Sequence, residues 1–177
     1  MKLIILGSGG YGHTVADVAT QLGYEIKFLD DSIPGCQLAT FVNYIPISCA
    51  PSNNTQQQTY FIPAFGNDEF RLEWVEKLEK HGAILATLIH PSAYISPTSI
   101  INHGTVILPH AIINTDVVVG KGCIINCGAM VDHGCVIEDG CHICLGAIVK
   151  GENKIKAKTK IEAGVVVEAR AYPLQNK

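Results

Sequence analysis

The chain has 177 residues, of which 47% are apolar and 16% are charged, so it can bury a core and is not generally disordered. Its formal net charge of −3 argues against a protein that neutralises nucleic-acid phosphates. No apolar run approaches the roughly 20 residues that a membrane-spanning helix needs. The N-terminus lacks the pattern of a signal peptide and the seven cysteines are an odd number, so we expect a cytoplasmic protein without disulfide bonds.

Residues 1–82 are predicted to form an α/β domain. The apolar run LIIL at 3–6 is typical of a buried strand, and a helix is expected over 14–22. A second strand, YEIKFLDD, ends in Asp30 and Asp31, and a third, TYFIPAFGN, ends at Gly66 and Asn67. Between them lies a loop-like stretch that includes NNTQQQ at 53–58. Asp68 is the expected N-cap of a second helix, whose apolar face is formed by Phe70, Trp74, Val75 and Leu78.

The turn after the first strand reads GSGGYGH. Gly7, Gly9 and Gly12 have the spacing of a dinucleotide-binding turn, and Asp30 lies where the ribose-binding acid belongs. A full dinucleotide fold needs two mononucleotide-binding halves, and this domain has room for about one. The sequence therefore favours a nucleotide-sugar site, in which helix N-terminal amides face the phosphates. The alternative is a turn whose glycines only permit tight packing.

Residues 83–177 have a repeat of six residues. Every sixth residue from Ile89 to Val167 is isoleucine or valine, and the residue four positions further on is nearly always small. This pattern predicts a hexapeptide parallel β-helix, in which three hexads make one coil and the branched residues stack inside. The unbroken register leaves no room for an excursion loop that would bind the acceptor, so acceptor recognition is expected from the N-terminal domain.

The repeat gives the cysteines a structural role. Cys123, Cys135 and Cys141 fall on the small inward position and are expected to be buried thiols. Cys141 and Cys144 form CHIC, which imitates a metal or redox motif, but the repeat directs them apart, so we expect no metal site.

The motifs GSGGYGH, FLDD, FGNDEFR, LIHPSAYISPTS and INCGAMVDHGCVIEDGCHICLGA follow one another in this order. This combination resembles the family of left-handed β-helix acetyltransferases that acetylate nucleotide-linked amino sugars in the bacillosamine pathway, relatives of the sialic acid O-acetyltransferases. The resemblance implies a half-Rossmann-like N-terminal domain that holds the nucleotide, followed by a left-handed parallel β-helix. It also implies a homotrimer in which acetyl-CoA lies between neighbouring β-helices.

The resemblance also implies roles for individual residues. His133 matches the general base, and a histidine is suited to accept a proton near neutral pH. His142 matches a contact to the thioester end of acetyl-CoA, Gly151 matches the amide that serves the thioester carbonyl, and Ala163 matches a further coenzyme contact. The expected substrate-binding residues are Gly9, Gly10 and Tyr11 at the phosphate turn, Asp30 and Asp31 at the strand end, Gly66 in the third loop, and Asn126 near the sugar. For His103 and His110 we favour a purely structural reading.

Two departures from the family pattern are visible. The family usually has an acid directly after the base histidine, whereas this chain has Gly134, and Asp132 is expected to point away because neighbours on a strand face opposite sides. The chain also ends soon after Val167, so the terminal cap and part of the coenzyme groove are expected to be missing. Four lysines between residues 154 and 160 are expected either to face coenzyme phosphates or to form a solvated face at an open end.

The predicted function is acetyl-CoA-dependent N-acetylation of a nucleotide-linked sugar, most specifically a UDP-4-amino-4,6-dideoxy sugar in bacterial glycan biosynthesis. The alternatives are a sialic-acid-type O-acetyltransferase and a catalytically impaired nucleotide-sugar-binding protein. A trimeric zinc enzyme of the γ-carbonic anhydrase kind needs a close histidine pair, which the histidine spacing here does not supply.

Overall fold

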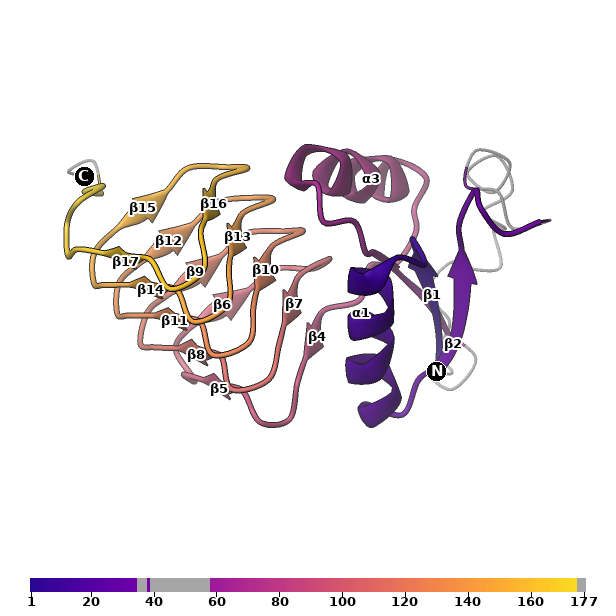
Figure 1. Cartoon of the computed structure of the whole chain (residues 1–177), viewed down its shortest axis with the longest axis horizontal. Coiled ribbons are helices and arrows are strands. Elements are labelled where there is room, and N and C mark those ends of the chain that lie inside the picture. The colour runs from indigo at the N-terminus through magenta and orange to yellow at the C-terminus, as the bar shows by residue number, and fades with distance from the viewer. Residues whose placement is uncertain (35–37, 39–57, 175–177) are drawn as a thin grey trace.

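The computed structural model describes residues 1–34, 38 and 58–174. The N-terminal domain contains a three-stranded parallel sheet in the order β2-β1-β3, formed by β1 (Lys2–Leu6), β2 (Glu25–Leu29) and β3 (Thr59–Pro63). Helix α1 (Gly10–Gln21) packs against β1 and β2 of this sheet, and helix α3 (Asp68–Lys80) packs against β3 (Figure 1). Most of the loop-like stretch expected before residue 59 lies outside the described residues.

Both helices begin at positions that differ slightly from the predictions. Helix α1 begins at Gly10 rather than at residue 14, since extended Gly9 is its N-cap and the glycines enter the first turn. Helix α3 is capped by Asn67 and not by Asp68, because the Asn67 side chain accepts the backbone N–H of Phe70 at 2.8 Å. Asp68 lies in the first turn, where a negative charge suits the helix dipole. Phe70 was expected on the buried face, but it is 41% exposed.

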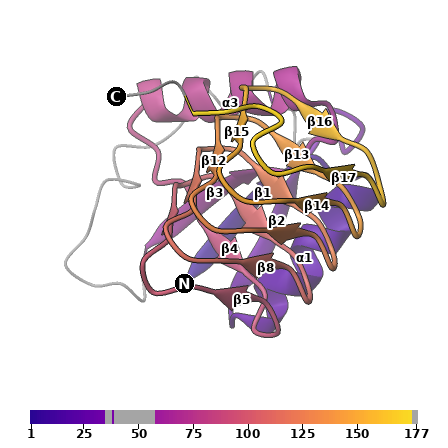
Figure 2. The ribbon, with the colours of Figure 1, turned by 90° about the vertical axis from the view of Figure 1, so that its left-hand side faces the viewer.

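The second part of the chain is a parallel β-helix of two-residue strands, as predicted (Figures 1 and 2). The three sheets are named here after their first strands. The β4 sheet contains β4 (Leu88–Ile89), β7 (Val106–Ile107), β10 (Ile124–Ile125), β13 (His142–Ile143) and β16 (Lys160–Ile161). The β5 sheet contains β5 (Tyr94–Ile95), β8 (Ile112–Ile113), β11 (Met130–Val131), β14 (Ile148–Val149) and β17 (Val166–Val167). The β6 sheet contains β6 (Ile100–Ile101), β9 (Val118–Val119), β12 (Val136–Ile137) and β15 (Lys154–Ile155).

The interior follows the hexad. The second residue of each strand points inward and stacks on its equivalent in the next coil, as Ile125 does on Ile107 and Ile143. The expected burial of Cys123, Cys135 and Cys141 is confirmed. Each coil turns its corners with a residue at positive φ, repeated every sixth position from Gly104 to Arg170. Most of these corner residues are glycine, which adopts that conformation without a steric cost.

The N-terminal domain packs against the β4 sheet. The outward side chains of Leu88, Val106 and Ile124 are buried, and they share one apolar cluster with Val15 and Val18 of α1. Burial on both faces makes the β4 sheet part of the core between the two parts of the chain. The predicted domain boundary after residue 82 falls in the connection between α3 and β4, where the backbone of residues 84–86 still hydrogen-bonds to strand β3.

The far end of the β-helix differs from the prediction of an open, uncapped end. Asn153 is buried and donates to the carbonyls of Lys150 and Glu168, while its side-chain oxygen accepts the Tyr172 N–H at 2.8 Å. Asn153 and Pro173 form an antiparallel bridge, so the C-terminal segment folds back across the last coil (Figure 2). An asparagine at an inward position supplies the hydrogen bonds that this closure needs.

The lysines of the last coils do not form a uniform cationic face. Lys154 pairs with Glu138 at 2.8 Å, and Lys160 pairs with Glu162 at 3.1 Å. Among the residues that the structure describes, no helix is long and apolar enough to cross a membrane.

Candidate active site

The glycines of the first turn have two different structural roles. Gly7 has a φ of +102°, and a Cβ on Gly12 would lie 2.2 Å from the Gly7 carbonyl oxygen, so these two residues permit the tight passage from β1 to α1. A Cβ on Gly9 or Gly10 would meet nothing within 4 Å. No neighbouring atoms therefore crowd the backbone at Gly9 and Gly10, at the N-terminus of α1. The free amide groups of a helix N-terminus can bind an anion.

Asp30 is tied to this turn by four hydrogen bonds. One carboxylate oxygen accepts the backbone N–H and hydroxyl of Ser8, at 2.6 and 2.9 Å. The other accepts the N–H and hydroxyl of Ser32, at 2.9 and 2.6 Å. These bonds, with that from the Ser32 hydroxyl foremost, hold the pKa of Asp30 well below its usual range. The neighbouring Asp31 accepts the backbone N–H of Leu38 at 2.8 Å. Both acids therefore hold backbone groups in place at the edge of the sheet where the nucleotide site is expected.

Two further expected substrate residues lie near this turn. Gly66 follows β3, and a Cβ there would meet nothing within 4 Å. The hydroxyl of Tyr11 is buried and has no hydrogen-bond partner, and burial raises the pKa of this phenol strongly. The charges of Arg71 and Asp68 on α3 also act on the pKa of this hydroxyl, by less than burial does.

The candidate base His133 lies on a corner of the β-helix. Strand β11 ends at Val131, and 59% of the His133 side chain is exposed. Its Nδ1 is 3.1 Å from the Asp132 carboxylate, which also accepts the backbone N–H of His133 at 2.8 Å. The prediction that Asp132 points away was wrong, because residues 132 and 133 belong to the corner and not to a strand. The hydrogen bond from the His133 N–H is the main reason why the pKa of Asp132 is lowered.

Gly151 lies against the ring of His133. A Cβ at Gly151 would come within 2.7 Å of the ring carbon Cε1 and 2.9 Å of Nε2. Gly134 has a φ of +64° because it is the next corner residue. The acid beside the His133 ring is therefore Asp132, which precedes it in the chain.

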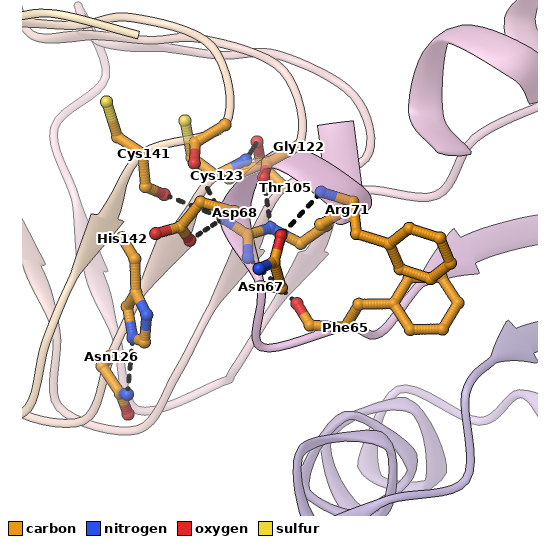
Figure 3. A network of polar contacts seen from close by, with 12 residues as sticks. Phe65, Asn67, Asp68, Arg71, Thr105, Gly122, Cys123, Asn126, Cys141 and His142 are labelled. Carbon is orange, nitrogen blue, oxygen red and sulfur yellow. Dashed lines mark hydrogen bonds and ion pairs between the residues drawn. The ribbon is translucent and has the colours of Figure 1, made fainter. Parts of the chain in front are cut away.

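His142 lies on β13 and is held by Asn126. The side-chain nitrogen of Asn126 is 3.1 Å from His142 Nε2 (Figure 3). His142 Nδ1 is buried and has no hydrogen-bond partner. Burial, more than the surrounding charges, lowers the pKa of His142.

Arg71 joins the two parts of the chain through a network that the sequence analysis missed (Figure 3). It is 1% exposed and donates to the carbonyls of Gly122 at 2.7 Å, Gly140 at 2.8 Å and Phe65 at 3.0 Å. It also pairs with Asp68 at 2.7 Å. The only signal in the sequence was the motif FGNDEFR, in which an acid precedes the arginine by one helical turn.

The candidate base His133 and the candidate coenzyme contact His142 lie on different sides of the β-helix within one chain. His142 and Asn126 lie on the side of the β-helix that packs against the N-terminal domain. His133 lies between β11 and β12, at the corner where the β5 and β6 sheets meet. That corner is the one that does not touch the β4 sheet, so His133 lies opposite the N-terminal domain. Ala163 follows β16 at another corner and is exposed.

The two histidines for which a structural role was expected, His103 and His110, have surroundings that fit such a role. His103 pairs with Glu79, and His110 occupies a corner with a φ of +59°. Over residues 1–34, 38 and 58–174, no group of three or more histidine, cysteine or acidic side chains could hold a metal ion.

Comparisons with known proteins show which family and which solved structures the chain is similar to. The family model for the PglD N-terminal domain matches residues 2–78. The acetyltransferase domain of PglB from Neisseria gonorrhoeae is 31% identical, with a TM-score of 0.82, and the match covers 96% of this chain and 83% of that one. The same domain in complex with acetyl coenzyme A is 32% identical, with a TM-score of 0.83 and coverage of 96% and 82%.

PerB from Caulobacter crescentus, in complex with CoA and GDP-perosamine, is 24% identical with a TM-score of 0.76, covering 98% of this chain and 92% of that one. PerB therefore shares the fold of this chain. The predicted architecture, an α/β domain followed by a left-handed parallel β-helix, is confirmed. The chain belongs to the family of left-handed β-helix acetyltransferases that includes the acetyltransferase domain of PglB, and it is an acyltransferase.

Proposed function

We propose that this acyltransferase moves the acetyl group of acetyl-CoA to the amino group of a nucleotide-linked sugar. One observation carries the proposal: the strands of the β-helix repeat without an inserted loop, and a domain with an open glycine turn packs against one of its sheets. The N-terminal domain is then the part of the chain available to hold the acceptor. The likeness to a PglB acetyltransferase domain in complex with acetyl coenzyme A supports the choice of donor.

The nucleotide is assigned to the carboxyl edge of the three-stranded sheet. The open backbone of Gly9 and Gly10 can approach the phosphates, as can that of Gly66. Asp30 and Asp31 follow β2 at this edge and are assigned to the ribose or sugar hydroxyls. Because the Asp30 carboxylate already accepts four hydrogen bonds, a hydroxyl there would replace one from Ser8 or Ser32. Tyr11, the residue that follows Gly10, is assigned to the same phosphate turn. We assign a UDP-4-amino-4,6-dideoxy sugar as the acceptor.

The chemistry assigned to the β-helix is a direct transfer. The sugar amine attacks the thioester carbonyl carbon, a C–N bond forms, and the C–S bond breaks. His133 Nε2 takes the proton from the amine while Asp132 stabilises the charged ring through Nδ1. Gly151 lies beside His133, so its backbone amide is assigned to stabilise the oxyanion. The departing thiolate takes the proton that His133 accepted from the amine and leaves as the free thiol. His142 and Ala163 are assigned to the coenzyme.

This assignment requires more than one subunit. His133 lies opposite the N-terminal domain of its own chain, so the base that serves a given nucleotide site must come from a neighbour. The outer face of the β5 sheet presents exposed apolar side chains in four of its five strands, which fits burial between subunits: Tyr94, Ile112, Met130 and Val166. We therefore propose a homotrimer with acetyl-CoA between neighbouring β-helices. Its compartment is proposed to be the cytoplasm, where the acetyl donor is available.

The test is a thiol-release assay with acetyl-CoA and a UDP-4-amino-4,6-dideoxy sugar, run beside the His133→Ala variant. Turnover that is lost in His133→Ala supports both the reaction and the base. Turnover with sialic acid instead of the amino sugar would replace the proposal by O-acetylation. Binding of the nucleotide sugar without any turnover would point to a catalytically impaired binding protein. Light scattering on the purified chain tests the trimer.

A further inference from the structure

The orientation of the Asn126 side-chain amide is fixed by the backbone. Its oxygen accepts the N–H of Cys127 at 2.8 Å. A backbone N–H can only donate, so the atom that faces it must be the amide oxygen. The amide nitrogen is therefore the atom that lies 3.1 Å from His142 Nε2.

This orientation decides which ring nitrogen of His142 carries the proton. The amide nitrogen of Asn126 can only donate, so Nε2 has to accept. In a neutral imidazole the other nitrogen then bears the hydrogen, because the hydrogen bond at one nitrogen sets the protonation of the other. His142 consequently has an N–H at Nδ1. That nitrogen is buried, and no group of the described chain accepts its hydrogen bond.

The charges around His142 leave the ring neutral. Asp68 is paired with Arg71 at 2.7 Å, and Lys160 is paired with Glu162 at 3.1 Å. Among the described residues these four groups are the charges that act on the pKa of His142, and each acid is matched by a base. Burial favours the uncharged ring.

We propose that Asn126 is a positioning residue, which holds His142 as a neutral Nδ1–H donor for an acceptor oxygen of a bound substrate. An N–H that is buried without a partner is costly, and an acceptor oxygen that arrives with the substrate removes this cost. The oxygen belongs to the thioester of acetyl-CoA or to the nucleotide sugar. The part of the inference that concerns substrate rests on the proposed function, whereas the tautomer of His142 does not.

His133 and His142 therefore differ in which ring nitrogen is free and in whether that nitrogen can accept a proton. Asp132 lies at Nδ1 of His133 and leaves Nε2 free to accept a proton. Asn126 occupies Nε2 of His142 and leaves only a donor. His142 cannot serve as the base in this arrangement, and Asn126, which the sequence analysis placed near the sugar, acts through His142.

The experiment is a long-range ¹H–¹⁵N correlation spectrum of the full chain labelled at histidine. The His142 signals are identified by their loss in His142→Gln. We expect Nδ1 protonated and Nε2 unprotonated in the ligand-free protein. In Asn126→Asp, the carboxylate can only accept at Nε2, so that nitrogen becomes protonated. Asn102→Asp is the matched control, because Asn102 has the equivalent hexad position 24 residues earlier and donates to the Val119 carbonyl; it should leave His142 unchanged.

Further arms test the donor role. Acetyl-CoA alone and UDP-sugar alone are each titrated into the labelled protein, and the ligand that shifts the His142 Nδ1–H signal identifies the source of the acceptor oxygen. Asn126→Asp should also lower kcat by about tenfold or more, which corresponds to the loss of one hydrogen bond in the transition state.

A wild-type spectrum with the proton on Nε2 would overturn the inference, even if Asn126→Asp failed to fold. Unchanged Nδ1 signals with both ligands would overturn the donor role. If the wild type showed the expected tautomer and a ligand-dependent shift but no turnover, the proposed reaction would fail while this inference stood.

Discussion

The backbone of Gly151 lies so close to the imidazole of His133 that a Cβ there would come within 2.7 Å of the ring. The two residues are 18 positions apart, so they occupy the same corner in successive coils. The position of the candidate base is therefore set by the absence of a side chain in the next coil.

Gly151→Ala should displace the His133 ring. The φ of Gly151 lies outside the left-handed region, so alanine is compatible with the backbone and the fold should be retained. A displacement of about 1 Å can cost on the order of 100-fold in rate, and we expect a fall of this size in kcat. Steady-state kinetics and thermal unfolding measure the two effects separately. Full activity in Gly151→Ala would show that the ring position is not set by this contact.

Asp132→Asn should lower kcat by about tenfold. The amide still accepts the His133 backbone N–H, so the corner should keep its structure. The negative charge beside Nδ1 is lost, and the imidazolium formed during proton transfer loses its stabilisation. Asp116→Asn is the matched control, because Asp116 is an exposed corner residue at positive φ, a conformation that asparagine tolerates. Equal rates in both variants would contradict a role for Asp132.

Arg71→Met should destabilise the protein by about 3–5 kcal/mol, the usual cost of removing one partner from a buried ion pair. The variant leaves the carbonyls of Gly122 and Gly140 without their donor at the contact between α3 and the β-helix. Urea unfolding gives the free energy. Lys77→Met removes an exposed ion pair with Glu73 and should cost less than about 1 kcal/mol. A similar loss in both variants would mean that the Arg71 network contributes no more than a surface pair.

Asp30→Asn should show a stability difference that depends on pH. The pKa of Asp30 is lowered in the folded protein, so its contribution is present above the unfolded value of about 3.9 and is lost as pH falls through the folded value. The difference in unfolding free energy between wild type and Asp30→Asn is therefore expected to be largest near neutral pH. It should shrink progressively below about pH 4. Unfolding curves at several pH values measure it, and a difference that stayed constant would contradict the assignment.

Tyr11→Phe tests the buried hydroxyl. That group has no partner in the described structure, so its removal should leave the melting temperature unchanged or raise it. If Tyr11 contributes to the acceptor site as proposed, the variant should have a higher KM for the nucleotide sugar and an unchanged KM for acetyl-CoA. A lower melting temperature would show that the hydroxyl is hydrogen-bonded in solution.

Much of the fold could be predicted because its information is local. The inward isoleucines and valines recur every six residues, and the glycine turn directly follows an apolar strand. Residues close in the chain determine such features through side-chain size and backbone freedom. The start of α1 and the N-cap of α3 differ from the predictions, since several polar or small residues compete for a helix terminus.

The sequence by itself determined the β-helix, the parallel α/β domain, the buried cysteines and the residue types of the candidate site. The tertiary structure decided how they meet: Arg71 with two corners of the β-helix, Asn126 with His142, and Gly151 with His133. It also placed Asp132 beside His133, and His133 opposite the N-terminal domain. These relationships join residues on different coils, corners or domains. They depend on how the coils close and on how the two parts of the chain pack, which a six-residue period does not specify.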